Sequence, residues 1–429
     1  MMRRGRTPND ILAVLDVGTS KVSCLVAARG AGGRHHATHG SDGGSLPARV
    51  LGIGHQRARG MKAGVVVDIA DAEQAIREAI AQAERAAGLR VETAILSVAC
   101  GRLASVNFRA NAQLGNHPVN DADIGRVMAA GQSYAERDGR RLVHLNRINW
   151  RLDGQSNIRE PRGMRGSLIE ADLHAVTADE APLRNLLIAV ERARVNVTGI
   201  VAAPFAAGLA VTSPEERRFG VTVLDMGAGI TTLSFFTQGH LVNSDVVVMG
   251  GTQITYDIAS ALTIPLAQAE RIKTLYGSLA VAASDEHEIV FHPQIQDETD
   301  AHRVTRARLR QIIRPRAEET FRLLRDRIER NKFVAVASDR VVLTGGGSLL
   351  AGGVEAAAHL LGRPVRIGKP RAISGLPEAF VAPPFATLVG LLQSLFVPGA
   401  CELASVGQGA SEARDGYLGQ VGNWLRQSF

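Results

Sequence analysis

The sequence predicts an α/β protein with two lobes, and three observations support this fold class. The chain has 429 residues, more than one compact core usually holds, so two or more lobes are expected. A strand, an acidic residue, a glycine-rich turn and a second strand occur near residue 16 and again near residue 225. Helical segments with apolar residues spaced by three and four alternate with short apolar strands. The repeated hairpin indicates an internal duplication.

The composition is that of a soluble globular protein. Hydrophobic residues make up 45% of the chain and charged residues 21%. The net charge of +7 favours acidic partners or anionic lipid, but it is diffuse, and we expect no nucleic-acid partner. No apolar run approaches the ~20 residues of a membrane span, and the basic start lacks the apolar stretch of a leader. The cysteines, Cys24, Cys100 and Cys401, show no paired spacing, so we expect a reducing, cytoplasmic location.

The first part of the chain predicts a hairpin, a long loop and a helix. Two strands rich in β-branched residues, in ILAVLDVGTSKVSCLVAAR, meet at a Gly-Thr-Ser turn. Residues 30–47 are rich in Gly, Ser and His and predict a surface loop. Its histidines, His35, His36 and His39, could hold a metal, but no carboxylate or thiolate frames them, so a solvated loop is favoured. VLGIGHQ predicts another strand, and an Ala/Glu/Arg-rich helix then ends at Gly88.

Changes in composition divide the rest of the chain. A region of short strands and helices predicts a small separate lobe, and the hairpin pattern then begins again at FGVTVLDMGAGITTLSFFTQGHL. A charge-rich helical section follows this second hairpin. The predicted segments are 10–91 and 178–213 for the first lobe, 92–177 for the inserted lobe, 214–264 and 336–397 for the second lobe, 265–335 for a helical subdomain, 398–416 for a flexible linker and 417–429 for an amphipathic helix.

The turn of the first hairpin has the composition of a phosphate-binding loop. Gly18 permits a sharp turn in which successive N–H groups converge on phosphate oxygens. The hydroxyls of Thr19 and Ser20 add donors, and Lys21 adds a positive charge. Asp16, just before the turn, would face a metal ion through water, because Mg²⁺ keeps much of its hydration shell.

Two later segments repeat this chemistry. The second hairpin turn follows Asp225, and its residues are Gly227, Ala228, Gly229, Ile230, Thr231 and Thr232. The third segment ends a buried strand and is predicted to begin a helix; its residues are Thr344, Gly345, Gly346, Gly347 and Ser348. Glycines there would let the backbone lie flat against a base or ribose. One such turn is more often only a tight turn, but three in this order are hard to obtain by accident.

With these three segments the chain resembles the superfamily of actin, Hsp70 and the sugar kinases, from about Ile11 to Phe396. The resemblance implies an actin-like fold of two ribonuclease-H-like lobes that bind ATP and Mg²⁺ between them. It implies that Asp16 and Asp225 position Mg²⁺ and water and that the three segments bind the nucleotide. It also implies further nucleotide contacts from Gly250, Gly251, Glu270 and Lys273. From the residues alone, Glu270 and Lys273 could equally form a solvated ion pair.

Within that superfamily, three features resemble the FtsA family of bacterial cell-division proteins. They are the early inserted lobe, the segment VTRARLRQIIRPRAEETFRLLRDRIE and the C-terminal segment. The resemblance implies a protein that polymerises and tethers the FtsZ ring to the cytoplasmic face of the inner membrane at the division site. The implied partners are the C-terminal peptide of FtsZ, further copies of the chain, membrane lipids and downstream division proteins.

The FtsA resemblance also gives a role to a run of arginines. By composition alone the run is more readily a solvated basic helix, whereas the resemblance favours docking of the acidic FtsZ peptide. The arginines are Arg303, Arg306, Arg308, Arg310, Arg314 and Arg316.

The end of the chain predicts a membrane anchor. Its apolar residues fall on one helical face and are Tyr417, Leu418, Val421, Trp424, Leu425 and Phe429. A helix docked on the protein would have the same pattern, but the preceding flexible linker favours an anchor lying in the membrane plane. Arg426 is the anchor's only cation, so attachment must come mostly from apolar burial.

One position departs from an ATPase. The superfamily places a Glu or Gln at a strand-to-helix crossing to orient water, and Ala203 stands at the matching position here. We therefore expect at most a slow ATPase, with ATP mainly a structural and switching ligand.

Other functions of the same fold are less favoured. A sugar or acetate kinase lacks a convincing acidic base, and an Hsp70 chaperone lacks room for a peptide-binding domain after Phe396. A pilus-assembly adaptor would share the loops but not the terminal helix. Gly362 to Lys369 imitates a Walker A loop, but its glycine spacing is wrong and Pro370 replaces the metal-binding hydroxyl.

Overall fold

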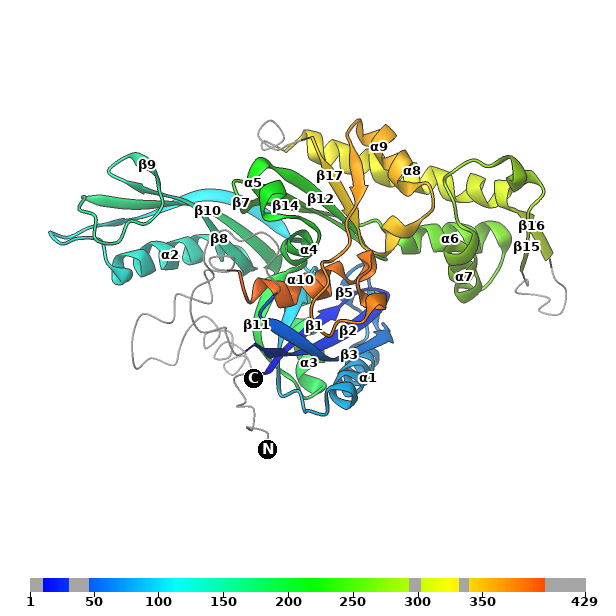
Figure 1. Ribbon diagram of the computed structural model, residues 1–429, viewed down its shortest axis with the longest axis horizontal. Helices are drawn as coiled ribbons and strands as arrows, with labels where there is room; N and C mark the ends of the chain where they lie inside the picture. The colour runs from blue at the N-terminus through cyan, green and yellow to red at the C-terminus, as the bar shows by residue number, and fades with distance from the viewer. Residues whose placement is uncertain (1–10, 31–45, 293–301, 332–338, 398–429) are drawn as a thin grey trace.

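Two five-stranded sheets form the centres of the two lobes (Figure 1). Equivalent strands follow in the same order when one of the two sheets is read in reverse. The computed structural model describes residues 11–30, 46–292, 302–331 and 339–397. The first sheet has the order β11-β6-β1-β2-β3, with β1 (Ile11–Val17), β2 (Lys21–Arg29), β3 (Ala48–Arg57), β6 (Thr93–Val98) and β11 (Asn196–Ala202). The second has the order β14-β13-β12-β17-β18, with β12 (Val221–Met226), β13 (Thr231–Thr237), β14 (His240–Val247), β17 (Val341–Thr344) and β18 (Val365–Ile367).

The duplication predicted from the two hairpins extends to the whole of each sheet. In both lobes the first strand pairs antiparallel with the second, and the second pairs antiparallel with the third. In both lobes the first strand also pairs parallel with the fourth, on its other side. Strands β1 and β12 occupy equivalent places in the two sheets. The residues that follow them along the chain are therefore brought to corresponding positions in the two lobes.

Helix α1 (Ile69–Ala87) packs unusually close to the first sheet. It begins at Asp68, whose side chain accepts a hydrogen bond from the Asp71 N–H at 3.0 Å, and it ends at Gly88 with φ +66°. A Cβ at Gly54 of β3 would lie 1.7 Å from the carbonyl oxygen of Ala79 in this helix. The alanine-rich helix and the strand glycine therefore depend on each other, because a larger side chain on either one would push the helix away from the strand.

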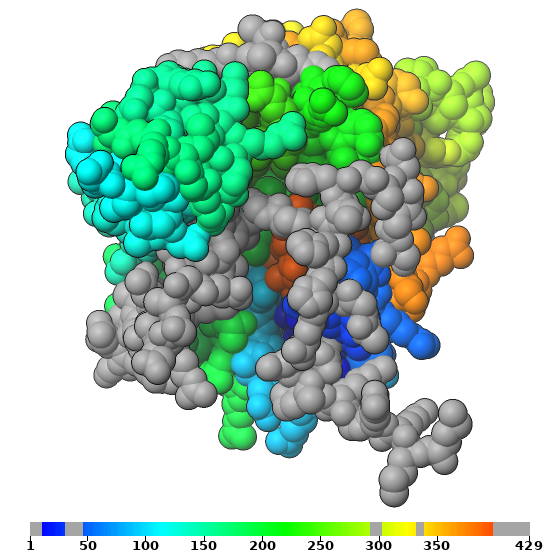
Figure 2. All heavy atoms as spheres, turned by 60° about the vertical axis from the view of Figure 1, so that its left-hand side comes forward, coloured from blue at the N-terminus to red at the C-terminus, as the bar shows by residue number. Residues whose placement is uncertain are grey.

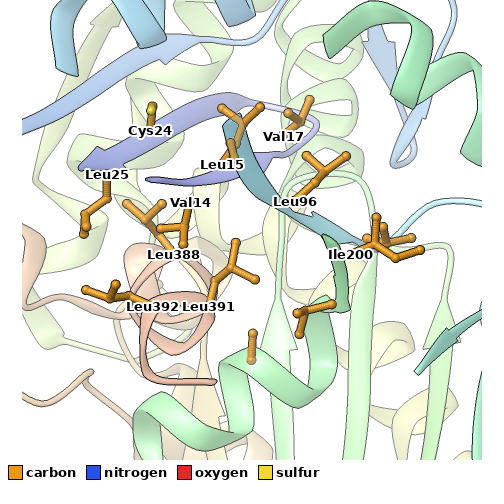
Figure 3. Packing of buried hydrophobic residues seen from close by; sticks show 14 of the residues in the cluster. Val14, Leu15, Val17, Cys24, Leu25, Leu96, Ile200, Leu388, Leu391 and Leu392 are labelled. Atoms are coloured by element: carbon orange, nitrogen blue, oxygen red, sulfur yellow. The ribbon is translucent and has the colours of Figure 1, made fainter. Parts of the chain in front are cut away.

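Two apolar helices lie between the sheets and join the lobes. They are α4 (Ala203–Val211), which follows β11, and α10 (Ala386–Ser394), which follows β18 at the equivalent place in the second lobe. Leu388, Leu391 and Leu392 of α10 pack beneath strands β1 and β6 of the first lobe (Figure 3). A Cβ at Gly390 would lie 1.7 Å from the Ala206 carbonyl oxygen of α4, so the two helices touch backbone to backbone. The connection between the lobes is thus part of the main hydrophobic core.

Further elements complete the two lobes. The first lobe adds α3 (Glu180–Arg192) and a short hairpin of β4 (Met61–Lys62) and β5 (Val65–Val66). The second lobe adds α5 (Pro214–Phe219) and α9 (Gly353–Leu361).

The inserted lobe is a four-stranded sheet, β7-β10-β8-β9, with one helix on it. Its elements are β7 (Ala104–Gln113), α2 (Asp121–Ala135), β8 (Arg140–Leu152), β9 (Gln155–Ile158) and β10 (Leu168–Asp179). Figure 2 shows it as a separate body against the second lobe. The predicted boundary at residue 92 is wrong, because β6 pairs with β1 and β11 in the first sheet.

The inserted lobe covers the edge strand β14 of the second lobe. The side-chain amides of Asn146 and Asn107 donate to the carbonyl oxygens of Leu241 and Val242 at 2.8 and 3.0 Å. The Ser244 N–H donates to the Ser105 hydroxyl at 3.0 Å. These side chains take the place of a neighbouring strand, which keeps the edge from pairing with another chain.

The helical subdomain begins earlier than the predicted residue 265. It contains α6 (Gly251–Leu262), α7 (Leu266–Tyr276), β15 (Ile289–His292), β16 (His302–Thr305) and α8 (Arg306–Glu329). Ile254 and Ile258 of α6 share one apolar cluster with residues of α7 and the first half of α8. The second half of α8, with Phe321 and Leu324, instead packs in the core of the second lobe. Helix α8 therefore ties the subdomain to that lobe.

Candidate functional site

The turns of the two equivalent hairpins meet between the lobes. The same bond closes each: the Gly18 N–H donates to the Lys21 carbonyl, and the Gly227 N–H donates to the Ile230 carbonyl, both at 2.9 Å. A Cβ at Gly229 would lie 2.6 Å from the hydroxyl oxygen of Thr19. Two turns more than 200 residues apart in sequence are therefore in contact.

Gly18 is not needed for the reason that the sequence suggested. Its φ lies outside the left-handed region, and an added Cβ would meet only the Lys21 carbonyl oxygen, at 3.2 Å. The Thr19 hydroxyl also has a structural task, since it accepts a hydrogen bond from the Gly64 N–H at 2.9 Å. This bond attaches the first turn to the β4–β5 hairpin.

Two carboxylates lie at the ends of β1 and β12. Asp16 Oδ1 accepts a hydrogen bond from the Ser97 hydroxyl at 2.6 Å, and Asp225 Oδ2 accepts one from the Thr387 hydroxyl at 3.0 Å. Burial raises the pKa of Asp225 to about 6; the bond from Thr387 opposes this, and the charge of Asp16 adds to it. Burial likewise raises the pKa of Asp16.

Lys21 is the cation next to these carboxylates. Burial lowers the pKa of Lys21, and the charges of Asp16 and Asp225 act in the opposite direction. The site therefore gathers two recessed carboxylates and one ammonium where the lobes meet. A pair of carboxylates with a phosphate nearby suits Mg²⁺, which takes one or two carboxylates and completes its shell with water and phosphate oxygens.

The third segment lies beside Asp225, because β17 pairs in register with β12 so that Thr344 is opposite Asp225. Gly345 has φ +82°, and a Cβ there would lie 2.3 Å from Asp225 Oδ1, so glycine is required. A Cβ at Gly346, in contrast, would meet nothing within 4 Å. The Ser348 hydroxyl donates to the Gly345 carbonyl at 2.7 Å. The predicted helix start is displaced: a 3₁₀ turn covers Gly346–Leu349, and α9 begins at Gly353.

Gly250 and Gly251 close the second turn from the other side. The N–H groups of Gly251 and Thr252 donate to the carbonyls of Gly227 and Ala228 at 3.0 and 2.8 Å. A Cβ at Gly250 would lie 2.5 Å from both of those carbonyl oxygens. A small hollow opens next to them, lined by Gly250, Gly251 and Gly347 with the apolar side chains of Met226, Leu279 and Leu350.

Glu270 and Lys273 form the ion pair that their spacing indicates, but the pair is also attached to this region. Lys273 Nζ lies 2.7 Å from Glu270 Oε2 and donates to the Gly251 carbonyl at 2.9 Å. Both side chains also contact the Thr255 hydroxyl. They therefore hold the start of α6 in place beside the glycines.

Ala203 lies at the strand-to-helix crossing, as expected. It is the first residue of α4 and is buried, between Ala202 and Pro204. These three neighbours carry no polar side-chain atom that could orient water.

The arginine run is not the free cationic surface that the sequence suggested. Arg316 forms two bonds with Asp257, at 2.7 and 3.0 Å, and Arg314 pairs with Glu318 at 2.6 Å. Arg306 pairs with Glu288 at 2.6 Å, and Arg310 pairs with Asp285. Four of the six charges are thus compensated within the subdomain. Among the described residues, Arg303 and Arg308 have no carboxylate partner.

Several predictions fall on residues outside the described ranges. They are the histidine-rich part of the loop at 31–45, the linker, Cys401 and the terminal amphipathic helix with Leu418, Val421, Trp424, Leu425 and Phe429. The other two cysteines, Cys24 and Cys100, are buried. Within the described ranges, no helix is both long and apolar enough to span a bilayer.

Comparison with known proteins identifies the family. The family model described as "Cell division protein FtsA" matches residues 222–390, and "SHS2 domain inserted in FTSA" matches residues 100–177. A cell division protein FtsA from Agrobacterium fabrum is 38% identical over 431 residues, which cover 98% of this chain and 95% of the relative. The chain belongs to the FtsA family of cell-division proteins. The SHS2 match begins after β6, in agreement with the corrected start of the inserted lobe.

Solved structures establish the fold of this FtsA-family chain. The PilM–PilN type IV pilus biogenesis complex contains a chain with a TM-score of 0.62 at 19% identity, covering 90% of this chain and 99% of that one. MreB5 of Spiroplasma citri bound to ADP gives a TM-score of 0.50 at 15% identity, covering 90% and 95%. At such identities the likeness concerns the fold alone. The fold is actin-like, as the three glycine-rich segments indicated.

Sequence reasoning missed the hydroxyl groups that hold the two carboxylates. Ser97 comes from β6 and Thr387 from α10, far from the aspartates in sequence. Each is a single hydroxyl residue in an apolar run, LSVAC and ATLVGLL, and that isolation was the available signal.

Proposed function

We propose that this FtsA-family chain binds Mg-ATP between its lobes and uses the nucleotide as a structural and switching ligand. The observation that carries the proposal is the meeting of Asp16, Asp225 and Lys21 at the turns of two equivalent hairpins. Gly250, Gly251 and Gly347 lie beside that charge cluster and carry no side chain that would obstruct a nucleotide. MreB5 of Spiroplasma citri, which shares the fold, is described as bound to ADP and to AMPPNP.

In this proposal the chain's own residues divide the work. The carboxylates of Asp16 and Asp225 would hold Mg²⁺ through water, and Lys21 with the first turn would bind phosphate oxygens. The metal supplies charge neutralisation for the phosphates. Because Ala203 offers no polar group to orient water, hydrolysis would be slow, on the order of one turnover per minute against ~10 per second for a typical enzyme.

Two substitutions test the nucleotide site without disturbing the fold. Asp16→Ala removes a recessed carboxylate, and Gly346→Asp places a carboxylate in a space where an added Cβ meets nothing within 4 Å. Without nucleotide, Gly346→Asp should keep the wild-type unfolding midpoint and Asp16→Ala should remain folded, and both variants should lose Mg-ATP binding in calorimetry. Wild-type affinity in both variants would refute the proposed site.

We further propose that the chain polymerises and tethers the FtsZ ring to the cytoplasmic face of the inner membrane, where it recruits downstream division proteins. Membership of the FtsA family supports the division role, and the apolar face of residues 417–429 supports attachment to lipid. For FtsZ docking we propose Arg303 and Arg308 as contacts for an acidic peptide, because they pair with no carboxylate among the described residues.

A vesicle flotation experiment with FtsZ separates the two attachments. Trp424→Glu should release the protein from vesicles, since it removes a large apolar group and adds a carboxylate, a change of several kcal/mol. Charge reversal at Arg303 and Arg308 together should leave the protein on vesicles and release FtsZ. As a control, Arg426→Gln should matter little, because one cation contributes about 1 kcal/mol. Flotation of the Trp424→Glu protein at the wild-type level would show that the tail is not an anchor.

A further inference from the structure

The segment between β18 and α10, residues 368–385, crosses from the second lobe to the first and back; we name it the crossover segment. On the first lobe it lies against the edge strand β3, where the Val50 N–H donates to the Ser374 carbonyl at 2.8 Å. Back at the site, the Pro383 carbonyl accepts from the Gly345 N–H at 3.2 Å and from the Thr344 hydroxyl at 3.4 Å. The crossover segment therefore contacts both lobes close to the candidate nucleotide site.

The end of the crossover segment carries two aromatic residues that pack on the first lobe. The ring centroids of Phe380 and Phe385 are 4.6 Å apart. Both rings meet His55 of β3 edge to face, with centroid distances of 6.5 Å for Phe380 and 5.3 Å for Phe385. His55 Nδ1 lies 3.2 Å from the Ser23 hydroxyl on β2, so the histidine ring is held from both sides.

The Lys21 ammonium lies over the face of Phe385, 4.4 Å from the ring centroid. The other charged or titratable groups around Lys21 are Asp16 on β1, Asp225 on β12, and His55 and Arg57 on β3. The two carboxylates attract the ammonium. Among the described residues around Lys21, the aromatic face of Phe385 is an uncharged group that attracts the cation, and it belongs to the crossover segment.

We propose that Phe385 is a positioning residue for Lys21: its ring holds the ammonium between the aspartate pair and the phosphate position, and so links the crossover segment to the first phosphate loop. This inference rests on the proposed binding of ATP and concerns the control of that same site. The crossover segment also forms hydrogen bonds with Thr344 and Gly345 of the third glycine-rich segment. It therefore contacts both the first turn, in the first lobe, and the third glycine-rich segment, in the second. A movement of the crossover segment would alter the first turn and the third glycine-rich segment together.

The test replaces the ring and follows Lys21 in two ways. Phe385→Leu keeps an apolar group without an aromatic face, and Phe385→Tyr keeps the face. Cation–π contacts of this kind correspond to about a 3- to 30-fold change in an equilibrium constant. Phe385→Leu should weaken ATP binding by a factor in that range at pH 7.5, and Phe385→Tyr should bind within about twofold of wild type.

Measurements at several pH values distinguish the positioning of Lys21 by Phe385 from general damage to the fold. The ring stabilises the charged amine, so its loss should lower the pKa of Lys21. In nucleotide-free protein, reductive methylation of Lys21, followed by mass spectrometry, should reach half its maximal rate at lower pH in Phe385→Leu than in wild type. The alkaline loss of ATP affinity should move the same way. Lys21→Arg, whose guanidinium does not titrate in this range, should show no alkaline loss with either residue at 385.

The outcomes are separable. If wild-type protein binds no ATP, the proposed function and this inference both fail. If wild type binds but Phe385→Leu has unchanged affinity and an unchanged methylation profile, the inference alone fails. An equal loss of affinity at every pH, with an unchanged methylation profile, would show that Phe385 only supports the fold, and would also overturn the inference.

Discussion

The first and second hairpins have the same topology but supply the site in opposite ways. The first turn presents side chains: a lysine, two hydroxyl residues and a glycine whose place could hold a Cβ at 3.2 Å from its nearest neighbour. The second turn presents backbone: its glycines and alanine lie against Thr19, Gly250 and Gly251, with no room for more atoms. The two copies of the hairpin have thus specialised: the first supplies charged and hydroxyl side chains, and the second lets the backbone pack closely against its neighbours.

The largest effect that we expect comes from filling the second turn. Gly250→Ala places a Cβ 2.5 Å from the Gly227 and Ala228 carbonyl oxygens, so the turn must move away from the glycines of α6. ATP affinity, measured by calorimetry, should fall by about 100-fold. Gly250 has an extended backbone, so steric crowding rather than φ strain is the cause.

Gly18→Ala is the matched control in the first turn. Its added Cβ meets a single oxygen at 3.2 Å, and its φ does not require glycine. We expect ATP affinity to change by no more than about threefold. Equal losses from the two substitutions would mean that the turns do not differ in the way described.

The second effect concerns the stability of the nucleotide-free protein and the carboxylates. The raised pKa of Asp225, about 6, means that the folded protein binds this proton more tightly than the unfolded chain. Asp225 therefore lowers stability as pH rises from about 4 to 6, by about 3 kcal/mol. Nucleotide-free Asp225→Asn should be more stable than wild type by about that amount above pH 6, and the difference should vanish below pH 4.

Urea unfolding at several pH values measures this difference. Asp16→Asn serves as the comparison in the first hairpin, where the pKa is raised in the same direction. A difference between Asp225→Asn and wild type that stays constant from pH 4 to 8 would contradict the assignment of the pKa to this carboxyl.

The smallest effect concerns the bond that attaches the first turn. Thr19→Val leaves the Gly64 N–H without its acceptor, which should cost about 1 kcal/mol of unfolding free energy. Thr19→Ser retains the hydroxyl and should remain close to wild type. If the valine variant is as stable as the serine variant, the Thr19 hydroxyl has no structural role.

Much of the fold could be predicted from local patterns. The two hairpins and helix α1 with its end at Gly88 follow from apolar periodicity and turn residues within short windows. The inserted lobe was predicted, but its start was not, because β6 has the same apolar character as a strand of either lobe. Which sheet a strand joins depends on pairing with β1, about 80 residues earlier in the chain.

The partners of charged side chains also could not be predicted from nearby sequence. Six arginines close together in sequence predict a basic surface, yet Arg316 reaches Asp257, which lies 59 residues away on α6. Likewise, Asp16 and Asp225 stand out as motif residues, but nothing nearby in sequence indicates that Ser97 and Thr387 donate to them. Ion pairs and hydrogen bonds between distant elements carry no local periodicity.

The sequence by itself determined which chemistry is present: two acidic residues before glycine-rich turns, one lysine and a third glycine run, repeated in an order that predicts an actin-like fold. Short-range rules suffice for this because strands, turns and helix ends are decided by neighbouring residues. Only the tertiary structure decided how that chemistry is arranged, including the hydroxyl on each carboxylate, the ring of Phe385 over Lys21 and the closeness of Gly345 to Asp225. Those contacts join residues brought together by packing of the two lobes, where separation along the chain no longer limits distance in space.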